Sequence, residues 1–106
     1  MAIVAIHQPE YLPWLGFFKK MMSSELFVFL DDAQFRKKDW QNRNRIRTKN
    51  GTTVLSIPVH AHSYPNINEI TIDNNKNWSE KHKKSILYNY AGAPYFEEFK
   101  DFIESV

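Results

Sequence analysis

Short apolar runs, each the length of a β-strand, open the chain on either side of a proline-containing loop. Residues 2–7 (AIVAIH) and 26–32 (LFVFLDD) are such runs, and Pro9 stops the first of them. Between the runs, apolar residues recur at the spacing of a helix at Leu15, Phe18 and Met22. We predict a buried strand, a short helix over 14–23 and a second strand, which form a right-handed βαβ unit with parallel strands.

The pattern in the middle of the chain predicts a β-hairpin and an edge strand. The β-branched run 52–58 follows a Lys-Asn-Gly turn in which Gly51 is free to adopt positive φ, so we expect this run to pair with 44–48. Apolar and polar residues then alternate over 67–72, which is typical of an edge strand.

Two helices are predicted after the edge strand. The first begins at Asn77 or Ser79 and ends at Gly92, and Pro94 opens the second, over 95–105. The first helix has one face made of Trp78, His82, Ile86, Leu87 and Tyr90. The second has an inner face made of Phe96, Phe99, Phe102 and Ile103. The expected fold class is α/β: a mixed sheet opened by the parallel βαβ unit, with a hairpin and two C-terminal helices.

The length of 106 residues fits a single domain with one modest core. The last helix reaches Val106 without a capping glycine, and the apolar faces exceed what so short a chain covers. We therefore expect either a homodimer or a missing C-terminal half. The domain assignment that we carry forward is a single domain, 1–106, that forms the N-terminal portion of a longer one.

The composition excludes several classes of protein. Apolar residues make up 42% of the chain and aromatic residues 15%, which argues against disorder. The absence of cysteine excludes disulfides, a thiolate nucleophile and a cysteine-bound metal, and it fits a reducing compartment. The N-terminus lacks the basic region of a signal peptide, and no apolar run is long enough to span a membrane. We expect a cytoplasmic protein with no membrane partner.

The net charge of +2 hides one strongly basic segment. Between Arg36 and Gly51 the sequence has seven basic residues and one acid, a local charge of +6, which leaves −4 for the rest of the chain. If the segment forms a strand, three arginines project to one face: Arg43, Arg45 and Arg47. Asn42, Asn44 and Ile46 then lie on the other face. Forked guanidinium groups in a row suit a phosphate or pyrophosphate.

Other chemistry gathers after the first two strands, at the sheet edge where ligands bind in open α/β folds. In the loop 7–14 we expect five side chains to cluster and to offer a base, an amide and two stacking faces: His7, Gln8, Glu10, Tyr11 and Trp14. Of the two acids that end the second strand, Asp31 and Asp32, only one can face a given site, because adjacent strand residues point to opposite faces. The structural alternatives are a loop packed over the core and a carboxylate paired with nearby bases.

Metal and cofactor motifs are absent from the sequence. His60 and His62 share one side of an extended segment, but no third ligand stands at a defined spacing, so we predict no metal site. The three glycines are isolated and form no phosphate loop, and no motif identifies a cofactor.

Four stretches, in this order, resemble the N-terminal part of the WbqC-like proteins: HQPEYLPWLGFFKK, FVFLDDAQFRKKDWQNRNRI, LSIPV and APYFEE. These bacterial proteins occur among genes for O-antigen and other surface-polysaccharide synthesis. The resemblance implies a transferase that moves a glycyl, aminoacyl or acyl group to a nucleotide-linked amino sugar.

We combine these observations into one predicted pocket that holds a nucleotide-linked sugar. The catalytic candidates are His7 and Asp32. The substrate-binding candidates are Gln8, Tyr11, Trp14, Trp40, Asn42, Arg43 and Arg45. The alternative is a non-catalytic RNA- or polyanion-binding module built on the basic hairpin 36–51. The acids just upstream and the near-neutral net charge argue against nucleic acid.

Overall fold

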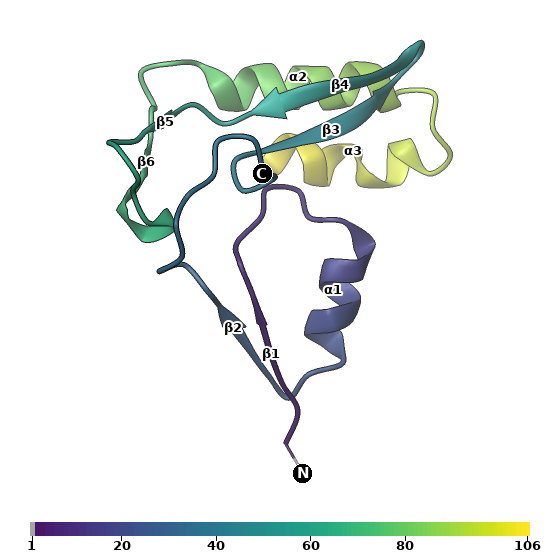
Figure 1. The fold of residues 1–106 in the computed structure, drawn as a ribbon. Helices are drawn as coiled ribbons and strands as arrows, with labels where there is room; N and C mark the ends of the chain where they lie inside the picture. Colours follow the sequence, from purple (N-terminus) through teal and green to yellow (C-terminus); the bar gives the residue numbers. More distant parts are fainter. Residues whose placement is uncertain (1) are drawn as a thin grey trace.

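The computed structural model describes residues 2–106, and its first unit is a parallel βαβ unit. Strand β1 (Val4–His7) pairs in parallel with β2 (Leu26–Phe29), and helix α1 (Leu15–Met22) connects them. Figure 1 shows the two strands side by side, with α1 along one face of the pair. The predicted βαβ unit is confirmed.

Helix α1 packs on the strands through Phe17, not through the residues whose spacing predicted the helix. The Phe17 side chain is only 4% exposed, and its ring meets that of Phe27 edge-on at 5.4 Å between centroids. Leu15 and Met22 are exposed instead. Periodicity located the helix correctly but chose the wrong face, because apolar residues surround this short helix on several sides.

The prediction that the first strand is buried is wrong for this chain. On the face away from α1, four apolar side chains are between 38% and 57% exposed: Val4, Ile6, Leu26 and Val28. We call these four residues the open face. Parallel strands are normally covered on both faces. Within residues 2–106, no element covers the open face.

The predicted hairpin is confirmed with slightly different bounds. Strand β3 (Arg43–Thr48) pairs antiparallel with β4 (Gly51–Ser56), and Gly51 turns the chain with φ of +147°. Ile46 and Leu55 are buried, whereas Arg45 and Arg47 project outward and are exposed. The alternation of faces in the basic segment is therefore as predicted.

The segment 67–72 is only partly a strand. Residues Ile67–Glu69 form a 3₁₀ helix, η1, and only β6 (Thr71–Ile72) is extended, paired antiparallel with β5 (Val59–His60). The first half of the predicted strand is wrong because Asn66 and Glu69 form a capping box. The backbone N–H of Asn66 donates to Glu69 Oε1 at 3.0 Å, which favours a helical turn at this point.

Helices α2 (Trp78–Tyr90) and α3 (Phe96–Ser105) form beside the hairpin, as predicted (Figure 1). The predicted inner face of α2 is right at His82, which is buried. The inner face of α3 is wrong at Phe99 and Phe102, which are 56% and 67% exposed. Helix α3 packs on α2, which in turn packs on β3, and no residue of α3 is fully buried, so part of its apolar face stays exposed.

The α/β fold class is confirmed, with the strands distributed over three two-stranded sheets. Among the described residues, four apolar side chains are buried: Phe17, Phe35, Ile46 and Leu55. The radius of gyration is 15.9 Å, whereas a compact domain of this length has about 13 Å. The core is small and divided among the βαβ unit, the segment that follows it and the hairpin. No helix in the described part of the chain is both long and apolar enough to cross a membrane.

Candidate functional site

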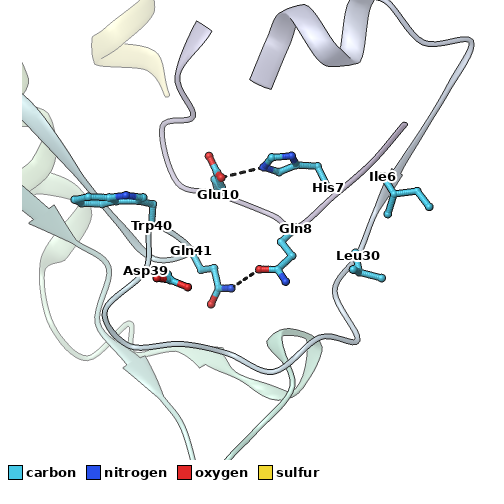
Figure 2. A pocket seen from close by; sticks show the side chains of 8 residues that line it. All are labelled: Ile6, His7, Gln8, Glu10, Leu30, Asp39, Trp40 and Gln41. Atoms are coloured by element: carbon cyan, nitrogen blue, oxygen red, sulfur yellow. Dashed lines mark hydrogen bonds and ion pairs between the residues drawn. The ribbon is translucent and has the colours of Figure 1, made fainter. Parts of the chain in front are cut away.

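A cavity of about 380 Å³ lies at the carboxyl end of β1, where the sequence predicted a site. Its walls come from the end of β1 and its loop, from the residue after β2, and from the segment before β3. The lining residues are Ile6, His7, Gln8, Glu10, Leu30, Asp39, Trp40 and Gln41. We call it the β1-end cavity. Figure 2 shows His7 and Glu10 on one side of it and Asp39, Trp40 and Gln41 on the other.

His7 is held from three directions. Its Nε2 lies 3.0 Å from Glu10 Oε1, and its Nδ1 lies 3.3 Å from the ammonium of Lys20. The rings of His7 and Phe17 pack in a T-shaped arrangement, with their centroids 4.9 Å apart. The side chains of His7 and Glu10 are 26% and 21% exposed, so this pair is partly shielded from water.

Two amide side chains join the opposite walls of the cavity. Gln41 Nε2 donates a hydrogen bond of 2.7 Å to Gln8 Oε1, as the dashed line in Figure 2 marks. Gln41 Oε1 accepts from the backbone N–H of Arg36 at 2.9 Å, which orients the amide. The loop after β1 is thereby fixed to the start of the basic segment.

The Trp40 ring makes cation–π contacts with two arginines. The guanidinium carbons of Arg43 and Arg45 each lie 5.1 Å from the ring centroid, within the range of cation–π attraction. Arg43 also donates to the backbone carbonyls of Lys38 and Asp39, so it holds the turn before β3. Arg45 has no such carbonyl contact among the described residues and is the freer cation. A stacking face and positive charge therefore meet at the rim of the cavity.

Tyr11 lies elsewhere, although its backbone N–H donates to the Trp40 carbonyl at 3.2 Å. Its hydroxyl lies 2.8 Å from Nδ1 of the buried His82, and His82 Nε2 lies 3.0 Å from the Ser56 carbonyl. Because a carbonyl only accepts, Nε2 carries the proton and Nδ1 accepts from the tyrosine. Burial lowers the pKa of His82, an effect that the bond to Ser56 partly offsets, and burial raises the pKa of Tyr11.

Tyr11 and His82 line a second, mostly apolar cavity of about 460 Å³ between α2 and α3. The structure thus places Tyr11 on the opposite side of its loop from the β1-end cavity. It links that loop to α2 and, through His82, to β4.

The remaining candidates lie outside the β1-end cavity. Asn42 donates to the Ile57 carbonyl at 2.9 Å, on the face of the hairpin away from the arginines. Trp14 is 68% exposed, and its indole lies so close over Gly16 that a Cβ there would overlap it. Asp32 is exposed beyond the end of β2. The structure therefore brings together His7, Gln8 and Trp40, with Arg43 and Arg45 at the rim.

Two residues that hold the predicted ones in place, Gln41 and Lys20, were not themselves predicted. Gln41 bonds to Gln8 across 33 positions of sequence, and Lys20 reaches His7 from α1. The position of Gln41 directly after Trp40 was a weak indication that it belongs to the site. Nothing in the local sequence indicated Lys20, because its contact with His7 depends on how α1 packs on β1. Within residues 2–106, no three histidine, aspartate or glutamate side chains gather in a metal-binding cluster.

Comparison with known proteins identifies relatives of the whole chain. A family model described as the WbqC-like protein family matches residues 8–106. The Uncharacterized protein Rv1507c of Mycobacterium tuberculosis (strain ATCC 25618 / H37Rv) is 35% identical over 108 residues, which cover 100% of this chain and 46% of the relative. The chain therefore spans less than half the length of that relative. No solved structure gives a significant match.

Proposed function

Because the chain belongs to the WbqC-like protein family, we propose that it binds a nucleotide-linked amino sugar in the β1-end cavity. We further propose that it serves the transfer of a glycyl, aminoacyl or acyl group to that sugar in surface-polysaccharide synthesis, in the cytoplasm. In this reaction the sugar amine attacks an activated acyl ester. A C–N bond forms, the C–O bond of the ester breaks, and the amine loses protons to a base and to the leaving alcohol.

The observation that carries the proposal is the meeting of Trp40 with Arg43 and Arg45 beside the cavity that holds the His7–Glu10 pair. An indole ring offers a stacking face to a nucleobase, and forked guanidinium donors suit a diphosphate. The Gln8 and Gln41 amides offer donors and acceptors to sugar hydroxyls, and the His7–Glu10 pair offers a proton acceptor. One cavity with its rim thus supplies a group for each part of the ligand.

Calorimetry with UDP-glucose tests the binding part of the proposal. Replacing Arg45 by Ala should weaken binding by about 1.5–3 kcal/mol, the usual contribution of a hydrogen bond to a charged group. Arg47→Ala is the matched control, since Arg47 lies on the same strand face and is exposed, but Trp40 is not its contact. Equal affinity of the two variants, or no binding by the wild type, would refute the proposal.

A salt series separates the alternative, an RNA- or polyanion-binding module. The exposed side chains of Arg45, Arg47 and Lys49 on the hairpin favour this second function. Binding of single-stranded RNA through phosphates should fall steeply with salt as counterions are released, whereas a site with stacking and amide contacts should depend on salt less. RNA binding that both Arg45→Ala and Arg47→Ala weaken equally, with no response to UDP-glucose, would favour the alternative.

We also propose that residues 1–106 are the N-terminal portion of a longer domain whose remainder covers the open face. Three observations support this: the exposure of Val4, Ile6, Leu26 and Val28, the large radius of gyration, and the 46% coverage of the mycobacterial relative. Lys in place of Val28 should change the stability of residues 1–106 alone by less than about 0.5 kcal/mol. In the proposed longer protein it should cost several times more, because a charge would be buried. Equal effects in both, or a gene that encodes no extension, would refute this proposal.

A further inference from the structure

A chain of hydrogen bonds crosses the βαβ unit from α1 to the cavity. The Lys20 ammonium donates to the Ile6 carbonyl at 2.7 Å and lies 3.3 Å from His7 Nδ1. An ammonium has donors only, so Nδ1 must be the accepting nitrogen of the ring. The proton of the neutral imidazole is then on Nε2, which donates to Glu10 Oε1 at 3.0 Å.

This arrangement changes the role that His7 can play. Both of its ring nitrogens have partners inside the protein, so His7 has no free lone pair for a substrate proton. Glu10, by contrast, lines the cavity and is an acceptor through both oxygens. Its Oε2 has no hydrogen-bond partner in the described part of the chain. Asp39 also lines the cavity with a carboxylate, but Asp39 is exposed, whereas Glu10 is partly shielded and is held by His7. Glu10 is therefore the oriented carboxylate that faces the cavity with an open acceptor.

We infer that Glu10 is the catalytic base of the β1-end cavity and that His7 and Lys20 are its positioning residues, an inference that rests on the proposed function. Glu10 Oε2 takes one proton from the ammonium group of the amino sugar, which leaves an amine with a free lone pair. That lone pair forms the C–N bond to the acyl ester, and the second N–H proton leaves with the departing alcohol. Glu10 then returns its proton to solvent.

The geometry explains why three residues are needed. Lys20 is fixed by the Ile6 carbonyl, and the His7 ring packs on the buried Phe17, so neither partner is free to rotate independently. A proton on His7 Nδ1 would face the Lys20 ammonium, which selects the tautomer that donates to Glu10. The carboxylate is thus held with one oxygen bound and one oxygen open.

The tautomer of His7 can be measured directly, without substrate. In protein labelled with ¹⁵N-histidine, long-range ¹H–¹⁵N spectra should show His7 with Nε2 protonated and Nδ1 unprotonated, with His7→Asn as the assignment control. Lys20→Met should lower the fraction of this tautomer without abolishing it, because the Glu10 carboxylate still accepts from Nε2. Lys19→Met, which removes the neighbouring lysine of the same helix, should leave the fraction unchanged. A proton on Nδ1 in the wild type, or an unchanged tautomer fraction in Lys20→Met, would overturn the positioning role.

Binding of two probes tests the role of Glu10. UDP-glucosamine and UDP-glucose differ by an amine in place of one hydroxyl, so wild type should bind the amine form tighter by about tenfold or more. Glu10→Gln should lose this preference while it keeps the affinity for UDP-glucose, because Gln still accepts from His7. Lys20→Met should reduce the preference and Lys20→Arg should restore part of it.

The outcomes separate the two claims. If wild type binds neither probe, the proposed function fails and the inference fails with it. If wild type binds both probes equally, or if Glu10→Gln keeps the preference, nucleotide-sugar binding stands and the assignment of Glu10 is overturned.

Discussion

Replacing Tyr11 by Phe removes one hydroxyl that joins three segments of the fold. The hydroxyl donates to His82 Nδ1 at 2.8 Å, and His82 in turn donates to the Ser56 carbonyl of β4. The ring of Phe can keep the contact that Tyr11 makes with the imidazole, whose centroid lies 5.5 Å away. The substitution therefore isolates the effect of the hydrogen bond.

The expected cost follows from the burial of His82, which is 7% exposed. Without the hydroxyl, Nδ1 is left as a buried acceptor with no donor, which costs about 1–3 kcal/mol. Small domains have a total free energy of unfolding of about 5–15 kcal/mol, so this loss is large enough to measure. The loss comes from the folded state, so the dependence of unfolding on urea concentration should keep its slope.

Urea unfolding followed by circular dichroism at pH 7.5 measures the effect, since His82 is neutral there in both folded and unfolded chains. Tyr88→Phe is the matched control, because Tyr88 is 84% exposed and should tolerate the same chemical change within about 0.5 kcal/mol. If Tyr11→Phe and Tyr88→Phe have equal stability, the Tyr11 hydroxyl does not stabilise the fold through His82.

Three further predictions concern the same framework. Burial lowers the pKa of His82, so below about pH 6.5 the unfolded chain binds a proton that the folded chain does not. The free energy of unfolding should therefore fall as the pH drops below that value and level off below the folded pKa. His82→Gln should remove this part of the pH profile in urea titrations. Asn44 donates to the Tyr11 and Leu12 carbonyls at 3.1 and 2.7 Å, so Asn44→Ala should lower the free energy of unfolding by about 1–3 kcal/mol. Asn50 is exposed, and an equal effect of Asn50→Ala would contradict this anchoring role of Asn44. Arg43→Ala should lower the melting temperature more than Arg45→Ala, because only Arg43 donates to the carbonyls of Lys38 and Asp39; the opposite order in calorimetry would show that the turn does not depend on Arg43.

The sequence by itself determined the elements that depend on neighbouring residues. The βαβ unit, the hairpin turn at Gly51 and the two C-terminal helices were predicted because apolar spacing, turn residues and helix boundaries are local signals. The alternation of arginine and apolar positions on β3 followed from strand geometry alone. The position of the cavity followed from the rule that ligands bind at the carboxyl ends of parallel strands.

Tertiary structure decided which side chains meet. Tyr11 and His82 form a hydrogen bond although they are 71 positions apart in the sequence. The pairing of Gln8 with Gln41 depends on how the basic segment folds back over β1. The contact of Lys20 with His7 depends on the rotation of α1 about its axis, which Phe17 sets by packing into the sheet. Periodicity cannot distinguish between two apolar faces of one short helix, because that choice is made by the surface on which the helix packs. For the same reason the sequence placed His7 and Glu10 in one loop after β1, and only the packing of α1 against that strand decides which partners His7 has.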